Sequence, residues 1–170
     1  MSRKLLATVL STIPFFASFA IAQDKPVTLA PGCGAQGVKF EVKTIKGQQP
    51  AAQPESGKAL VYFFQDDSEL PLKPRPTTRL GMDGDWLGAT HGDSYFYFSA
   101  ARGIHHLCVS WQATEIANAR TAALHFTAEA GGIYYFGVRD RLGISFHPLD
   151  SDEGQFLLTR LTFSTSHPKK

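Results

Sequence analysis

The chain has 170 residues, of which 43% are hydrophobic and 19% charged, and its 17 lysines and arginines nearly balance its 15 aspartates and glutamates. This near-neutral balance, without a cluster of basic residues, excludes nucleic acid as an expected partner, because non-specific affinity for phosphate depends mainly on the number of cations. The length suits one domain with a hydrophobic core.

Residues 1–22 predict a secretory signal peptide. Arg3 and Lys4 supply its positive start, an apolar stretch follows, and Ala20-Ile21-Ala22 forms a small-x-small cleavage site. The mature chain then begins at Gln23 and loses both of those cations, which leaves 15 charges of each sign. Because no second apolar run of membrane-spanning length follows, we expect an exported protein, periplasmic or extracellular, with no transmembrane segment after signal cleavage.

The chain contains two cysteines, Cys33 and Cys108. In an oxidising compartment an even pair indicates one disulfide, which would join the N-terminal segment to the centre of the chain and contribute on the order of 4 kcal/mol. The competing interpretation is a reactive thiol or metal ligand at Cys108. That interpretation requires a reduced thiol in an oxidising compartment.

Residues 23–57 predict an N-terminal segment with one strand and a flexible linker. The strand is Val38–Thr44, in which apolar and polar residues alternate. The linker covers 47–57, because this stretch has no large apolar residue to offset the entropy of ordering. The main β domain covers 58–168 and starts with Lys58–Phe64, a strand that is apolar on both faces and therefore central in its sheet.

Residues 65–77 predict an extended surface loop, because its three prolines cannot donate backbone hydrogen bonds within a sheet. Loops of this kind often carry binding sites, so Leu72 and Arg75 are candidate binding residues. The alternative is a plain connection between two sheets, which loop-length statistics favour.

Residues 78–111 predict four short strands joined by tight turns. Asp83-Gly84 is a strong signal for a hairpin turn, since both residues tolerate positive φ. Trp86, beside this turn, is the aromatic residue we expect to be exposed and the third candidate binding residue. In the strand Ile104–Trp111 the side chains alternate between faces. The face that we expect to be buried holds His105, Leu107, Val109 and Trp111.

Three further strands are predicted at 122–128, 133–139 and 144–149, and residues 112–121 hold either a helical turn or a hairpin loop. A helix should begin at Ser151, whose hydroxyl caps an acidic first turn, and end near Phe163. We expect this helix to bury Phe156, Leu157 and Leu161 in part. Together these elements predict an all-β fold, an antiparallel β-sandwich of eight or nine strands with one C-terminal α-helix.

Four motifs in the chain carry a resemblance: LGMDGDWLG at 80–88, GDSYF at 92–96, RGIHHL at 102–107 and AEAGGIYYF at 128–136. They resemble PEGA-like domains and, more closely, an uncharacterised family of exported bacterial proteins that is named only as a domain of unknown function. The resemblance covers roughly residues 58 to 162 and departs from the pattern at Arg102, usually Pro, and Gly132, usually Lys. It implies a secreted or envelope-associated domain and carries over no catalytic residue.

His105 and His106, with Cys108, come nearest to a metal site. Neighbouring residues of a strand point to opposite faces, however, so one strand presents only His106 and Cys108 together. Further ligands would have to come from His91, His125 or His147, whose spacings match no known zinc pattern. We therefore predict no metal and no cofactor.

Functionally, the sequence favours an exported, non-enzymatic β-sandwich that acts by surface binding to an envelope protein or glycan. The alternative is a small secreted hydrolase or metal-binding enzyme, although no G-x-S-x-G elbow is present. A solvent-open cluster of His105 or His106 with acidic groups would favour the enzyme. An exposed flat patch around Trp86 and the loop at 71–76 would favour binding.

Overall fold

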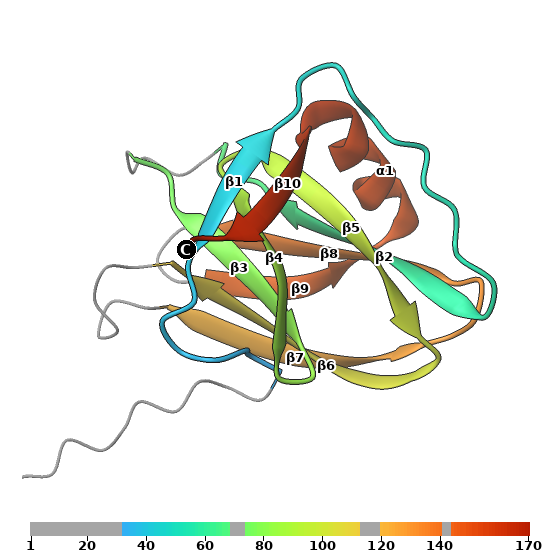
Figure 1. Cartoon of the computed structure of the whole chain (residues 1–170). Coiled ribbons are helices and arrows are strands. Elements are labelled where there is room, and N and C mark those ends of the chain that lie inside the picture. The colour runs from blue at the N-terminus through green and yellow to red at the C-terminus, as the bar shows by residue number, and fades with distance from the viewer. Residues whose placement is uncertain (1–31, 69–73, 113–119, 141–143) are drawn as a thin grey trace, which may run out of the picture.

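The computed structural model describes residues 32–68, 74–112, 120–140 and 144–170. These residues form two packed β-sheets and one α-helix (Figure 1). The elements in chain order are β1 (Phe40–Thr44), β2 (Lys58–Gln65), β3 (Thr77–Met82), β4 (Asp85–His91), β5 (Ser94–Ala101), β6 (Gly103–Trp111), β7 (Thr121–Ala128), β8 (Ile133–Asp140), β9 (Ile144–Leu149), α1 (Ser151–Arg160) and β10 (Thr162–Pro168). The mainly β architecture with one late helix is confirmed, but the described residues hold ten strands rather than eight or nine.

The larger sheet has the strand order β1-β10-β5-β2-β8-β9, and the smaller sheet has the order β4-β3-β6-β7. The prediction of purely antiparallel sheets is wrong for the larger sheet. Strand β2 pairs in parallel with β8, and β10 pairs in parallel with β5. Between β2 and β8 the chain forms all four strands of the smaller sheet and also β5, so a long crossover connection and not a tight hairpin joins these two parallel strands.

Strand β2 lies at the centre because it is apolar on both faces. On one face Leu60, Tyr62 and Phe64 pack in a cluster with Leu157 of the helix. On the other face, Ala59, Val61 and Phe63 pack toward the smaller sheet. The protein therefore has three layers, with α1 covering the outer face of the larger sheet (Figure 1).

The hairpin between β3 and β4 is built as its sequence predicts. Its two-residue loop consists of Asp83 and Gly84, which have φ values of 53° and 96°. Positive φ at both loop residues matches the right-handed twist of the flanking strands. This turn brings the Asp83 carboxylate beside strand β6.

The helix is shorter than predicted. Asp150, not Ser151, is the N-cap, and its side chain accepts a hydrogen bond from the Glu153 amide. The helix ends at Arg160, and the residues that follow form β10, a strand that the sequence pattern did not predict. Phe156 was expected to be partly buried but is 55% exposed, because only the opposite side of the helix, with Leu157, packs on the sheet.

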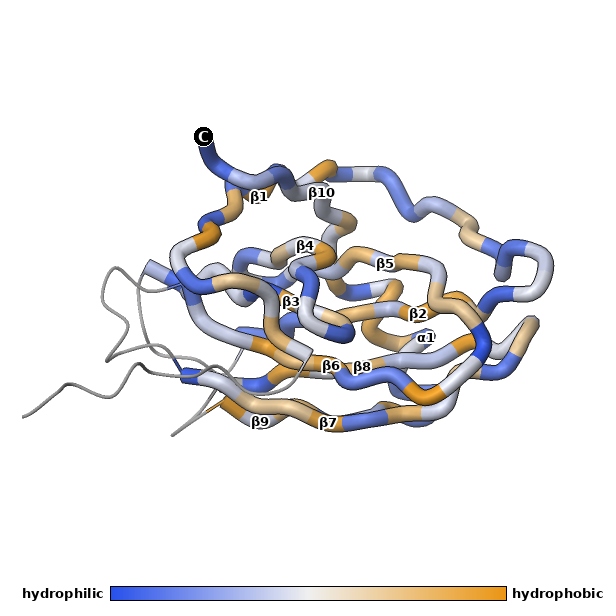
Figure 2. Tube along the Cα trace, turned by 60° about the horizontal axis from the view of Figure 1, so that its bottom comes forward, coloured by the Kyte–Doolittle hydropathy of each residue, from blue (hydrophilic) through white to orange (hydrophobic). Residues whose placement is uncertain are grey.

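At one side of the two-sheet arrangement lie the edge strands β7 and β9. These strands contact each other and run side by side at the bottom of Figure 2. On the other side β4 contacts β10, and the Ala89 amide donates a 2.9 Å hydrogen bond to the Ser166 hydroxyl. Strand β1 pairs with β10, so the predicted N-terminal strand is part of the larger sheet. Within the described residues, no helix is long and apolar enough to cross a membrane.

Candidate functional site

A cover segment, residues 32–38, lies across the outer face of the smaller sheet. Cys33 forms a disulfide with Cys108 of β6, with a Cα–Cα distance of 4.9 Å, in agreement with the expected pairing. The close approach depends on Gly32, because a Cβ at this position would lie 2.4 Å from the His106 carbonyl oxygen. Both cysteines are oxidised in this arrangement, so Cys108 supplies neither a thiolate nucleophile nor a metal ligand.

The candidate binding residue Trp86 is held by this cover segment. Its indole Nε1 donates a 2.8 Å hydrogen bond to the Ala35 carbonyl, and the Arg79 guanidinium lies 4.4 Å from the ring centroid. Gly34 packs against the ring edge. Burial lowers the pKa of Arg79, which also donates hydrogen bonds to the Val38 carbonyl and to Ser110. The Trp86 ring is therefore partly covered and internally partnered rather than an open platform.

Of the two candidate binding residues in the loop before β3, Arg75 lies within the described residues and Leu72 lies outside them. Arg75 forms an ion pair with Asp93, and its aliphatic stem packs against Gly92 in the turn between β4 and β5. The pKa of Arg75 is raised, first by its hydrogen bond to Asp93. The Asp93 carboxylate also accepts from the Asp67 amide. The ion pair thus holds the loop before β3 against the turn between β4 and β5.

His105 makes two hydrogen bonds that occupy both nitrogens of its ring. Nδ1 lies 2.6 Å from an Asp83 carboxylate oxygen, and Nε2 lies 2.7 Å from the Ala101 carbonyl oxygen. Both partners are acceptors, so the geometry fits the doubly protonated imidazolium. Burial alone would lower the pKa of His105, but the hydrogen bonds to Asp83 and Ala101 outweigh it and raise the pKa. His105 has no free nitrogen to act as a general base or as a metal ligand.

His106 lies on the opposite face of β6, as strand alternation predicts. Its backbone amide donates a 2.8 Å hydrogen bond to Asp83, and its Nδ1 lies 3.9 Å from the same carboxylate oxygen. Burial raises the pKa of Asp83, but the hydrogen bonds from His105 and from the His106 amide more than offset it and lower the pKa. Opposite His106 in the β6–β7 register stands His125, with 6.5 Å between the ring centroids. The spacing of His125 in the sequence does not predict that it lies opposite His106.

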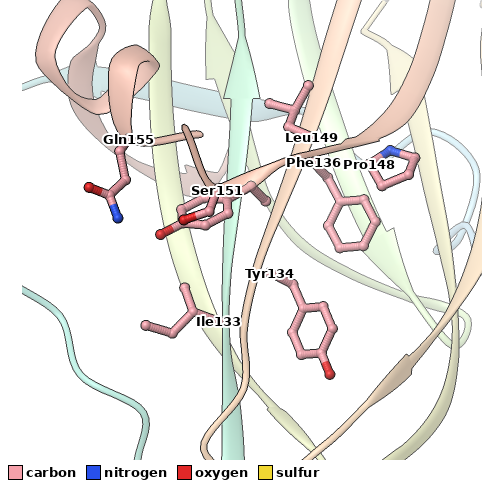
Figure 3. A pocket seen from close by; sticks show the side chains of 8 residues that line it. Ile133, Tyr134, Phe136, Pro148, Leu149, Ser151 and Gln155 are labelled. Carbon is pink, nitrogen blue, oxygen red and sulfur yellow. The ribbon is translucent and has the colours of Figure 1, made fainter. Parts of the chain in front are cut away.

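A half-open pocket of about 250 Å³ lies where β9 ends and α1 begins. Figure 3 shows Ile133 and Gln155 at one side of strand β8 and Tyr134 at the other, with Ser151 of the helix start between them. The last residue of β9, Leu149, pairs with Tyr135, so β9 does not extend along the start of β8. The lining mixes apolar side chains with the hydroxyl of Ser151 and the amide of Gln155.

Exposed apolar side chains accompany this pocket. Ile133 is 46% exposed, and Phe156, which follows Gln155 on the helix, is 55% exposed. No local sequence pattern predicts the pocket, because Ile133 and Gln155 are 22 positions apart and only the crossing of β8 and α1 joins them. We call the pocket together with Ile133 and Phe156 the β8–α1 surface. A pocket with an apolar body and a few polar groups is typical of binding sites and of active sites.

The fold and these sites define a disulfide-linked, two-sheet β protein with one covering helix. No family model matches the chain, and comparisons with curated proteins and with solved structures found no match either.

Proposed function

We propose that the protein is an exported, non-enzymatic β-sandwich that acts by surface binding, and that its partner is an envelope protein or glycan that contacts the β8–α1 surface. The observation that carries the proposal is the half-open pocket, whose lining includes the exposed side chain of Ile133, together with the exposed Phe156 next to the lining residue Gln155 in the helix. Isolated exposed apolar residues are common on proteins, but apolar residues that flank a pocket are typical of binding sites.

The chemistry of the remaining sites supports binding over catalysis. His105, the histidine best placed beside a carboxylate, uses both ring nitrogens in hydrogen bonds. Cys108 is part of the disulfide. A hydrolase needs a nucleophile, a base with a free lone pair and an orienting acid that converge on one point. The Asp83–His105 pair has the acid and the histidine, yet that histidine has no lone pair to accept a proton.

Export is supported by the signal-like residues 1–22 and by the disulfide, since disulfides persist in oxidising compartments. Intact mass of the protein recovered from the cell envelope or medium tests this part. We expect a mass that starts at Gln23 and no thiol alkylation until the protein is reduced. Retention of residues 1–22, or alkylation of Cys108 without reduction, would contradict export through an oxidising compartment.

Site-specific photo-crosslinking tests the binding surface. A photoreactive phenylalanine analogue replaces Gln155, at the pocket, or Thr165, an exposed control position on β10, in the full chain expressed in the cells that produce it. We expect a discrete adduct at 155 and none at 165. Ile133→Asp should abolish the adduct while thermal unfolding shows that this variant still folds. Protease or glycan-degrading enzymes then identify the partner as protein or glycan.

Equal adducts at both positions, or an adduct at 155 that Ile133→Asp does not change, would refute the β8–α1 surface as the binding site. The small hydrolase or metal-binding enzyme remains the second candidate. The exposed pair His106 and His125 is the observation that favours its metal-binding part.

A further inference from the structure

The outer face of the smaller sheet brings two histidines together from neighbouring strands. His106 of β6 stands directly opposite His125 of β7 in an antiparallel register. The Trp111 amide donates to the Arg120 carbonyl, so these two residues form a hydrogen-bonded pair. Along an antiparallel ladder, hydrogen-bonded pairs alternate with pairs that are not hydrogen-bonded. The pair His106 and His125 falls between the hydrogen-bonded pairs. Side chains of such a pair are the closest that an antiparallel sheet offers.

A second hydrogen bond confirms this register. The Asp83 amide donates to the His106 carbonyl at 2.9 Å, so the backbone of His106 bonds toward β3 and not toward β7. The two imidazoles therefore share one face with no backbone hydrogen bond between their residues. Their ring centroids are 6.5 Å apart. At this separation small side-chain rotations bring one nitrogen of each ring to one ion, for which metal–nitrogen distances near 2.0–2.1 Å are required.

Both rings are open to solvent. The His106 side chain is 58% exposed, and His125 is also exposed. His106 has Asp83 beside it, with 3.9 Å between Nδ1 and the carboxylate, so a negative charge lies next to the pair. A carboxylate near a metal-binding imidazole orients the ring and favours the cation. No other described cation forms an ion pair with Asp83, whose partners are His105 and His106.

We propose that His106 and His125 form a chelate for a divalent transition-metal ion, with Cu²⁺ bound more tightly than Zn²⁺. Two imidazole nitrogens bind the ion from adjacent strands, and water molecules complete its coordination shell. The described residues contain no group of three or more histidine, cysteine, aspartate or glutamate side chains placed to hold an ion, so the site is a two-histidine site open to an outside ligand. Imidazole ligands suit both ions, and affinities of such sites follow the order Cu²⁺ over Zn²⁺.

Three of the other described histidines, His91, His105 and His167, do not share this geometry. His105 points to the inner face and has no free nitrogen. His91 pairs with the Thr77 hydroxyl at 3.0 Å, and His167 lies 3.8 Å from Glu41. His167, with a side chain 69% exposed, is therefore a matched control: an exposed strand histidine beside a carboxylate, but without a second imidazole opposite.

Calorimetric titration of the tag-free, oxidised mature protein with copper chloride and with zinc chloride tests the proposal. We expect one site per chain, with Cu²⁺ bound at least about tenfold more tightly than Zn²⁺. His106→Asn and His125→Asn should each weaken Cu²⁺ binding by at least about tenfold, because each leaves a single imidazole. His167→Asn should leave it unchanged.

Electron paramagnetic resonance of the copper complex provides a second readout. We expect nitrogen couplings from two imidazoles in the wild type and from one in either single variant. Thermal unfolding of the metal-free variants verifies that each is folded. Binding that survives both single variants, or a spectrum without imidazole nitrogens, would overturn the proposal, because the copper would then be held elsewhere.

Discussion

Removing the Cys33–Cys108 disulfide should lower the free energy of unfolding, mainly because the unfolded chain gains conformational entropy. Cys33→Ala removes the disulfide but leaves the fully buried Cys108 in place, so the core keeps its packing. The folded cover segment also keeps its hydrogen bonds from Trp86 to Ala35 and from Arg79 to Val38. What changes is the freedom of the unfolded chain, which the disulfide restricts by closing a loop.

The expected magnitude follows from the length of that loop. The two cysteines are 75 positions apart, for which the loop-entropy relation gives about 4.5 kcal/mol at 25 °C. In a domain of this size each kcal/mol corresponds to about 2–4 °C in Tm, so Cys33→Ala should unfold roughly 9 to 18 °C below the wild type. Urea unfolding at 25 °C measures the free energy directly.

Reductant supplies the matched control. The wild type in reductant should approach the stability of Cys33→Ala, whereas Cys33→Ala itself should not respond to reductant. A loss of less than about 1 kcal/mol in Cys33→Ala would refute the reasoning, because a cross-link between these positions cannot leave the entropy of the unfolded chain nearly unchanged.

Three other substitutions test single contacts by urea unfolding. The raised pKa of His105 means that its contribution to stability is fully present below about pH 6.5 and is lost as pH rises through the folded-state pKa. In chelator-containing buffer His105→Gln should therefore cost more at pH 5.5 than at pH 8.5, and an equal cost would contradict the Asp83 contact. Gly154→Ala should destabilise by about 1–3 kcal/mol despite the better helix propensity of alanine, since its Cβ would lie 2.4 Å from the Tyr135 ring; a stabilised variant would contradict this packing. Arg79→Met should cost about 1–3 kcal/mol by leaving the Val38 carbonyl without its donor, and a neutral effect would contradict that role.

Local signals in the sequence were sufficient for the described strands other than β10 and for the turn between β3 and β4. The Asp83-Gly84 pair predicted a hairpin, and both residues have the positive φ that such a hairpin requires. The two apolar faces of Lys58–Phe64 predicted a central strand, and β2 packs against the helix on one face and the smaller sheet on the other. These predictions succeeded because they depend on residues that are close together in the chain.

Pairings between distant segments could not be predicted in this way. The parallel pairing of β2 with β8 joins residues about 73 positions apart, and nothing in either segment distinguishes it from an antiparallel pairing. The helix was predicted too long because Leu161 and Phe163 continue its apolar pattern. In the structure Phe163 pairs with Tyr95 of β5 within β10, so sheet pairing overrides the local helical pattern.

The candidate sites show the same difference between features that local sequence predicts and features that depend on pairing between distant segments. Alternation along β6 correctly separated His105, on the inner face, from His106, on the outer face. It could not identify His125 as the residue opposite His106, since that depends on the register between β6 and β7. The pocket between β8 and α1 likewise arises from tertiary packing, and its polar members Ser151 and Gln155 belong to an ordinary helix start.

Strand β7 contributes one residue to the histidine pair on one face and, on its other face, one residue that contacts the lining of the pocket. His125 points outward to His106, whereas the next residue, Phe126, points inward with its ring 5.2 Å from that of Tyr134, which lines the pocket. His125→Asn leaves Phe126 in place, so it should abolish tight copper binding without changing crosslinking at position 155. If copper alters that crosslinking in the wild type but not in His125→Asn, copper bound at the histidine pair is coupled to partner binding at the β8–α1 surface.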